Sequence, residues 1–383
     1  MKKWLSYLVA ATCLASCVYP FDPELPDDVA KTVVVDGRIL VGGVSTIQLG
    51  YLTPINSQNL HAWPNGQAWI EDDLGNRYTA EESGGNIFTI YGTQMIGAYG
   101  GASQQPATFR AVAVVDGETY TSDWLTPDPE PSIENIRFEA DETTVYVTVD
   151  LNPGLNSTGY IGFLFDETWE FHSQIYPDYY VDTNTWSYVS YMESQSPYPF
   201  YWCWRSYSPA QVRLFDYTDL AEGTIKGLPV RSFSRTDGRN HKRYSILVKA
   251  FALSKEAFQY NKQTQEISEL GGDLFSPDPG ALTGNLSCES NPELSVMGMV
   301  LAGRVAQKRA FVDSYKYLIS RPPSVTYEKV KREDMPQFYY QNNYRPAVMV
   351  DFEDGADIGW VHHRCINCIE AGGTQERPSF WED

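Results

Sequence analysis

Residues 362–368, with the sequence HHRCINC, combine two histidines and two cysteines over seven positions. Imidazole and thiolate groups are zinc ligands, but the chain has no second CxxC and no spaced pair of histidines to complete a tetrahedral site. A redox-active CxxC follows a strand and opens a helix, whereas Gly372 and Gly373 follow this one without helical periodicity. We therefore predict that these cysteines serve a structural disulfide and that the chain binds no metal.

Four cysteines are candidates for disulfide bonds: Cys203, Cys288, Cys365 and Cys368. An even number of cysteines in an oxidising compartment favours two bridges. Three pairings are possible, and the sequence does not choose among them. The interpretation we favour pairs Cys365 with Cys368 and Cys203 with Cys288.

A further cysteine, Cys17, ends the segment Leu14-Ala15-Ser16-Cys17, which has the pattern of a bacterial lipobox. It follows a short basic start and an apolar stretch that is too short to span a bilayer. We predict that residues 1–16 are a lipoprotein signal peptide and that Cys17 carries several acyl chains, palmitate among them, as a stable anchor. Residues 17–30, rich in proline and acid, then form a solvated tether. The alternative is an ordinary secreted protein with an incidental cysteine.

Motifs for nucleophilic, phosphate or metal chemistry are missing from the sequence, which has no GxSxG, GxxxxGK[ST] or HExxH. The acidic residues 351–357 lack the spacing of a calcium loop and are expected to form a solvated turn. A carboxylate pair for glycoside hydrolysis is defined by geometry that sequence alone does not supply. We therefore expect no catalytic residues, no cofactor and a protein that is not an enzyme.

Aromatic residues gather between Tyr160 and Tyr207, where 17 of 48 residues are Phe, Trp or Tyr, against 14% in the whole chain. Exposed aromatic side chains are common at the centres of binding interfaces. The candidate contact residues are Trp186, Tyr201, Trp202 and Trp204. The alternative is that these rings fill a large β core, and the sequence leaves the two readings open.

The elements that must position these residues are mostly strands. Residues 31–125 contain about seven short strands separated by turns, which is typical of an immunoglobulin-like sandwich. Within this region, Asp116-Gly117 predicts a tight hairpin turn. Residues 126–131 alternate proline with other residues and are predicted to be a linker.

Residues 132–383 are predicted to form a larger β-rich domain with the aromatic segment and the CxxC end. One helix is expected here, from Lys255 to about Ile267, with Ser254 as its cap. Phe380 and Trp381 are expected to anchor the end of the chain in a core.

Composition narrows the choice of partners. The 383 residues carry a net charge of −20 and a pI near 4.6, so a nucleic acid is not an expected partner. After the signal peptide, no apolar run is long enough to cross a membrane.

Several motifs resemble those of a family of Bacteroidota lipoproteins catalogued as domain of unknown function 4249. They are Val34-Val35-Asp36-Gly37, Cys203-Trp204, Thr283-Gly284-Asn285-Leu286, Gly298, Arg309-Ala310-Phe311-Val312, the CxxC end, Ala371-Gly372-Gly373-Thr374 and Arg377-Pro378-Ser379-Phe380-Trp381. The resemblance covers nearly all of the chain after Cys17. Members are often encoded beside TonB-dependent outer-membrane transporters, and the family offers no catalytic residues to carry over.

The resemblance and the lipobox together imply a non-enzymatic, lipid-anchored protein on the periplasmic or surface face of the outer membrane. It would be an accessory or binding subunit for a TonB-dependent transporter in nutrient uptake. Two alternatives remain at this point: a surface adhesin or structural protein, and a surface hydrolase of glycans or peptides.

Overall fold

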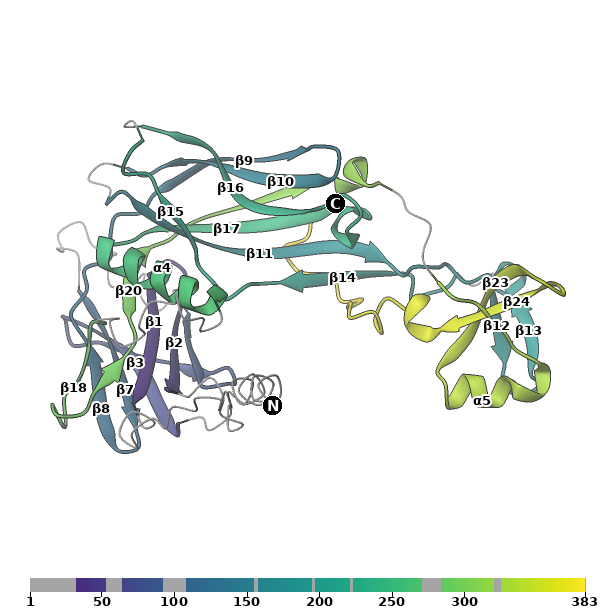
Figure 1. Cartoon of the computed structure of the whole chain (residues 1–383), viewed down its shortest axis with the longest axis horizontal. Helices are drawn as coiled ribbons and strands as arrows, with labels where there is room; N and C mark the ends of the chain where they lie inside the picture. The colour runs from purple at the N-terminus through teal and green to yellow at the C-terminus, as the bar shows by residue number, and fades with distance from the viewer. Residues whose placement is uncertain are drawn as a thin grey trace, which may run out of the picture.

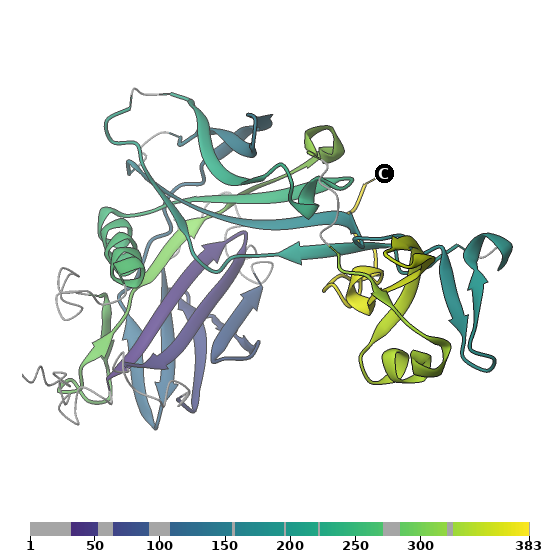
Figure 2. The same cartoon turned by 45° about the vertical axis from the view of Figure 1, so that its right-hand side comes forward.

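A computed structural model describes residues 32–52, 64–91, 108–154, 158–194, 197–220, 223–270, 284–319 and 325–382. It is mainly β, with 52% strand and 12% helix, which confirms the predicted fold class. An N-terminal sandwich lies at one end, a small distal module lies at the other, and a central sandwich joins them (Figures 1 and 2). The predicted signal peptide, Cys17 and the tether lie outside the described residues. Within the described ranges, no helix has the length and apolar character needed to cross a bilayer.

The N-terminal sandwich consists of two packed sheets. The first holds β1 (Val33–Val41), β2 (Val44–Tyr51), β5 (Glu81–Glu82), β6 (Ile87–Tyr91), β19 (Val296–Met297) and β20 (Val300–Arg304). The second holds β3 (Gly66–Asp72), β4 (Arg77–Thr79), β7 (Phe109–Val115), β8 (Glu118–Ser122) and β18 (Leu286–Cys288). Alternate residues of both sheets, among them Ile39, Ile47, Ile70 and Phe109, are buried in one core between them.

This sandwich does not end at residue 125. Strand β20 pairs in parallel with β1, with Val300 opposite Gly37, and β18 pairs with β8. The predicted domain boundary places these returning strands in the domain at 132–383, and for them this prediction is wrong. Apolar alternation identifies a strand, but it does not identify a partner more than 250 residues away.

Two glycines allow the returning strands to approach closely. Gly298 has a φ of +121°, and a Cβ atom there would lie 2.0 Å from the Val35 carbonyl oxygen. A Cβ atom on Gly284 would lie 1.7 Å from the Gly298 carbonyl oxygen. Between them, the Asn285 amide bonds both the N–H and the carbonyl of Val300, at 2.9 and 2.8 Å. These family motif residues therefore fix the return of the chain to β1.

The predicted linker, residues 126–131, is held in place by the same strand. Asp128 forms a parallel bridge with Gly303, and its carbonyl accepts a bond from the Arg304 N–H at 3.3 Å. The segment thus connects the two sandwiches while lying against β20.

The central sandwich also has two sheets. One holds β9 (Ser132–Ala140), β10 (Thr144–Asn152) and β16 (Ile225–Ser234). The other holds β11 (Tyr160–His172), β14 (Trp202–Tyr207), β15 (Arg213–Asp216), β17 (Tyr244–Ala252) and β21 (Ala306–Val312). Val147, Phe163, Tyr244 and Val248 are in the core between these sheets.

Helix α4 (Lys255–Leu270) follows β17 and confirms the predicted helix. The Ser254 hydroxyl accepts a bond from the Ala257 N–H at 3.1 Å, as expected of a capping residue. Phe258 shares a small core with Phe251 of β17 and with Leu40 and Leu301 of the N-terminal sandwich. This core joins the two sandwiches.

The distal module is inserted between the strands of the central sandwich and is completed by the C-terminal residues. Its elements are β12 (Tyr179–Asp182), β13 (Ser187–Ser190), α3 (Tyr191–Ser194), β22 (Glu328–Lys329), α5 (Met335–Tyr340), β23 (Tyr344–Phe352) and β24 (Gly355–His362). Trp360 and Met335 are buried in one small core and Ala347 and Val361 in another. The acidic residues 351–357 form the exposed β23–β24 hairpin, as predicted.

Candidate functional site

The cysteines pair differently from the interpretation that the sequence favoured. Cys203 of β14 bonds to Cys368, with the two Cα atoms 5.7 Å apart, while Cys288 and Cys365 are free thiols. Cys288 is buried in the core of the N-terminal sandwich, whereas Cys203 belongs to the central core, so those two cannot meet. Cys368 is directed to β14 because its N–H donates to the Phe200 carbonyl at 2.9 Å.

The disulfide also bears on the zinc alternative. Because Cys368 is oxidised, it is not available as a thiolate ligand. Among the described residues, no three His, Cys, Asp or Glu side chains are grouped as a metal site would need.

Alkylation of the purified, unreduced protein checks this pairing. We expect the half-buried Cys365 to react slowly, because burial raises the pKa of its thiol. The buried Cys288 should react only after unfolding, and Cys203 and Cys368 only after reduction. Peptide mapping by mass spectrometry would identify each labelled cysteine. Protection of Cys365 until reduction would contradict the structure.

The four candidate aromatic residues do not form one surface. Tyr201 and Trp202 are neighbours, with ring centroids 5.4 Å apart. The Trp204 ring packs against Trp381, and Trp186 packs against Tyr339 and Tyr340 of α5 in the distal module. Trp381 is itself buried, which confirms it as an anchor for the end of the chain, whereas Phe380 is 38% exposed, so the prediction that it lies in a core is wrong.

The wider aromatic segment is divided between core and surface. Residues on β11, including Phe163, Trp169 and Phe171, are buried in the central core. Beyond β11, the rings of Tyr176 and Trp202 are 41% and 38% exposed. The core alternative therefore holds for the rings of β11, while a contact role for the exposed rings stays a prediction.

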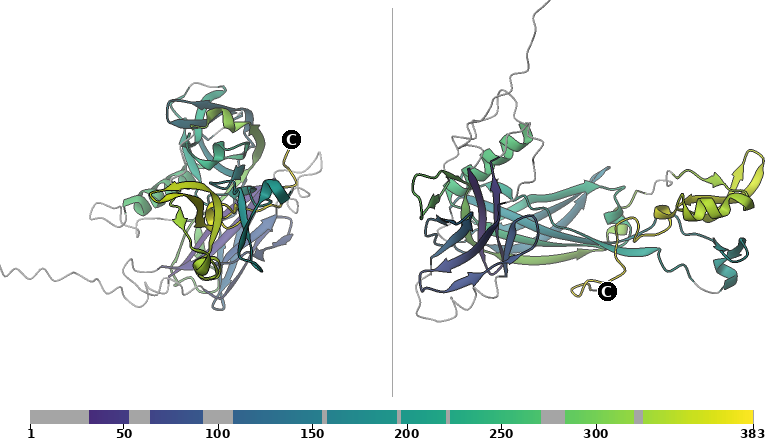
Figure 3. Two further views of the ribbon diagram at one scale, coloured as in Figure 1. Left: turned by 90° about the vertical axis from the view of Figure 1, so that its right-hand side faces the viewer. Right: turned by 90° about the horizontal axis from the view of Figure 1, so that it is seen from below.

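The exposed part lies where β11 and β14 leave the central sandwich toward the distal module (Figures 1 and 3). We call His172, Tyr176, Tyr201 and Trp202 the neck patch. The His172 ring stacks on Tyr201 at 4.9 Å and meets Trp202 edge to face at 5.1 Å. Tyr176 meets Tyr201 edge to face at 5.0 Å. The patch therefore presents a packed set of rings, and these lose little conformational entropy when a partner binds.

Neighbouring groups set the charge of the neck patch. His241 stacks beneath His172 at 4.1 Å, and desolvation together with the His172 imidazole lowers the pKa of His241 to about 4. It is therefore neutral at pH 7. The Lys242 ammonium lies 5.2 Å from the Trp202 ring and also pairs with Glu170 at 2.6 Å.

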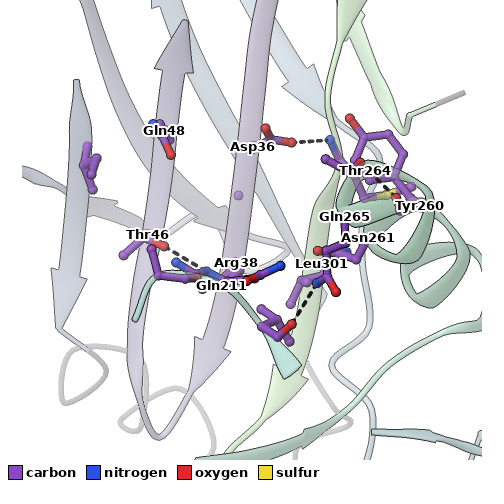
Figure 4. A pocket seen from close by; sticks show the side chains of 15 residues that line it. Asp36, Arg38, Thr46, Gln48, Gln211, Tyr260, Asn261, Thr264, Gln265 and Leu301 are labelled. Atoms are coloured by element: carbon purple, nitrogen blue, oxygen red, sulfur yellow. Dashed lines mark hydrogen bonds between the residues drawn. The ribbon is translucent and has the colours of Figure 1, made fainter. Parts of the chain in front are cut away.

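A second candidate site is a cleft at the junction of the two sandwiches, with a volume of about 230 Å³. Its strand side carries Asp36 and Arg38 of β1 and Gln48 of β2, and its helix side carries residues of α4 (Figure 4). Gln211, in the segment before β15, also lines the cleft. We call this the junction cleft.

Hydrogen bonds to neighbouring groups hold most of the polar side chains of the junction cleft. Arg38 donates to the Thr46 hydroxyl at 3.2 Å and to the Ala210 carbonyl at 2.8 Å. Asp36 accepts a bond from the Met299 N–H at 3.2 Å. On α4, the side chains of Asn261, Thr264 and Gln265 donate to the carbonyls of Ala257, Tyr260 and Val212. These bonds fix the orientation of the polar side chains around the cleft.

Desolvation affects both charged groups of the junction cleft. The Asp36 side chain is open to solvent on its cleft side. Desolvation by the surrounding protein nevertheless raises the pKa of its carboxyl. The hydrogen bond from Met299 and the charge of Arg38 lower this pKa, but they offset the desolvation only in part. The same desolvation lowers the pKa of the Arg38 guanidinium, with Asp36 acting against it. Asp36 is the single acid among the described residues that line the junction cleft. These residues therefore do not supply the second carboxylate that a two-carboxylate mechanism needs.

Sequence reasoning missed the junction cleft. Asp36 and Arg38 alternate with apolar residues along β1, as ordinary solvent-facing residues of a strand do. Their helix-side partners follow more than 200 residues later. No local pattern distinguishes this arrangement from a solvated sheet face.

Taken together, the two sandwiches, the distal module, the neck patch and the junction cleft define a multidomain β protein with two candidate binding surfaces. The chain belongs to the family described as domain of unknown function (DUF4249), whose model matches residues 18–309. This confirms the resemblance inferred from the motifs, although the CxxC end lies beyond the matched residues. A comparison with curated proteins found no match.

Proposed function

We propose that this chain is a non-enzymatic lipoprotein of the outer membrane, anchored through Cys17, and an accessory binding subunit for a TonB-dependent transporter in nutrient uptake. The lipobox and the family membership support the anchor and the setting. The observation that carries a binding role is the neck patch, a packed and partly exposed set of aromatic rings beside a lysine.

The position of the neck patch fits a protein partner. It lies between the central sandwich and the distal module, away from the N-terminal sandwich that carries β1 (Figure 3). A chain tethered before β1 would therefore present the patch away from its anchor. Aromatic residues at such surfaces supply a large share of binding energy.

Replacing Trp202 by alanine is expected to weaken transporter capture by about tenfold or more, as loss of a central interface tryptophan does. The side chain is 38% exposed, so folding should be preserved. The measurement is affinity capture from gently solubilised outer membranes, with quantitative mass spectrometry of the recovered partner.

The matched control is Trp124→Ala. Trp124 is 46% exposed and also lies near a cation, with the Arg110 guanidinium 5.0 Å from its ring, but it is outside the neck patch. Equal capture by both variants and the wild type would show that the neck patch is not the contact. Recovery of the lipoprotein without a transporter would favour a surface adhesin instead.

A further inference from the structure

The junction cleft has hydrogen-bonding capacity that the protein does not use. Within the described part of the chain, one carboxylate oxygen of Asp36, the side-chain carbonyl of Asn261 and that of Gln265 accept no bond from a protein donor. Likewise, the side-chain amides of Gln48 and Gln211 form no protein hydrogen bond. Most of these unused groups are hydrogen-bond acceptors. The donors are the side-chain amides of Gln48 and Gln211 and the Nη2 of Arg38.

We infer that the junction cleft binds one ring of a neutral sugar. The inference names the ligand class of the binding subunit proposed above and rests on that proposal. Sugar hydroxyls donate and accept at once, so they match planar amides and a carboxylate arranged around a small cavity. One carboxylate and one guanidinium leave the lining without net charge, which gives no advantage to a charged ligand.

The apolar lining agrees with a sugar ring, which has C–H faces as well as hydroxyl edges. Met299, Leu301 and Val212 contribute aliphatic surface, and Tyr260 contributes an aromatic ring. The volume of about 230 Å³ is smaller than that of sites for drug-sized ligands, about 300–1,000 Å³, so one ring would fill it.

An amino acid is the competing ligand, since Asp36 could take its ammonium and Arg38 its carboxylate. Arginine binds carboxylate best through two parallel N–H bonds. In the junction cleft, Nε of Arg38 already donates to Thr46, and Nη1 already donates to Ala210. The side-on fork has therefore lost Nε to Thr46, and the end-on fork would have to share Nη1 with Ala210, which disfavours the zwitterion.

Isothermal titration calorimetry of the full chain, purified in detergent, tests the inference. The probes are D-glucose, D-galactose and N-acetyl-D-glucosamine, with glycine and glycylglycine as zwitterions. We expect at least one sugar to bind with a Kd of about 1 mM or tighter, a range suited to one small ring. Binding of a zwitterion alone, or of no probe, would overturn the inference.

Two variants locate the binding in the junction cleft. Asp36→Asn and Gln48→Ala should each weaken sugar binding, the first by about tenfold because hydrogen bonds to a charged acceptor are the stronger ones. Gln48 is exposed, so its replacement should not disturb folding. Gln67→Ala is the matched control, since Gln67 is an exposed glutamine on β3 of the other sheet.

Unchanged affinity in both cleft variants would place any sugar site elsewhere and overturn the inference. The assay contains no transporter. Failure of sugar binding is therefore distinguishable from failure of the transporter capture measured with Trp202→Ala.

Discussion

Replacing Glu167 by alanine is expected to lower the free energy of unfolding by about 3–5 kcal/mol, the range found when one partner of a buried ion cluster is removed. Glu167 lies on β11, and its side chain is 0% exposed. Its Oε1 accepts bonds from Nε of Arg231 and Nε of Arg239, both at 3.1 Å, and from the Tyr244 hydroxyl at 2.8 Å. Alanine would leave these three donors without their shared acceptor.

After the loss of Glu167, the Arg239 guanidinium could not easily turn out into solvent. Its side chain is only 12% exposed, and its guanidinium lies 4.3 Å from the centre of the Trp169 ring. Burial, together with the Glu167 carboxylate, raises the pKa of Tyr244 well above its ordinary value, so the phenol remains a donor at all working pH values. The Tyr244 hydroxyl therefore needs the Glu167 carboxylate as its acceptor.

Urea unfolding followed by tryptophan fluorescence measures this effect. Glu167→Gln keeps the shape and loses the charge, so an intermediate loss is expected. Asp354→Ala is the control, because Asp354 pairs with Lys329 at 2.7 Å but is 71% exposed, and such surface pairs contribute about 0–1 kcal/mol. If Glu167→Ala were no less stable than this control, the buried cluster would not contribute to stability.

The Glu167 cluster also illustrates what sequence could not predict. The partners of Glu167 lie 64 to 77 positions later in the chain, and one arginine comes from a strand while the other comes from a short 3-10 helix, Gly238–Asn240. Sequence showed many carboxylates without indicating which of them is buried. The pairing of side chains depends on which strands meet.

Local rules, by contrast, predicted local elements well. Asp116 and Gly117 have φ values of +53° and +89°, as the tight turn between β7 and β8 requires. Ser254 caps α4, and the predicted helix begins at the expected residue. In these cases the residues that determine the structure are neighbours in the chain.

Long-range pairing explains the remaining differences. The N-terminal sandwich takes β20 from residues 300–304, and the junction cleft combines β1 and β2 with α4. The sequence identified two of the neck-patch residues, Tyr201 and Trp202, because a high local density of aromatic residues is visible in the composition. Which rings are exposed depends on where β11 leaves the central core, and composition does not specify that point.

The second large effect is expected from the disulfide between Cys203 and Cys368. Replacing either cysteine by serine should lower stability by about 2–5 kcal/mol, because the bond closes a loop of 165 residues and restricts the unfolded chain. It also holds the C-terminal segment against β14, where Trp204 and Thr374 exchange two backbone bonds of 2.8 Å. Proteolysis near residue 374 should therefore become faster in the variants.

Cys365→Ser is the decisive control for this prediction. In the structure Cys365 is a half-buried free thiol, so its replacement should cost less than about 1 kcal/mol. If Cys365 were instead bonded to Cys368, Cys365→Ser and Cys368→Ser would destabilise the protein equally, and Cys203→Ser would not match Cys368→Ser. Unfolding curves of the three variants therefore separate the two pairings. A shared large loss for Cys203→Ser and Cys368→Ser would show that the bridge ties the C-terminal segment to the central sandwich beside the neck patch.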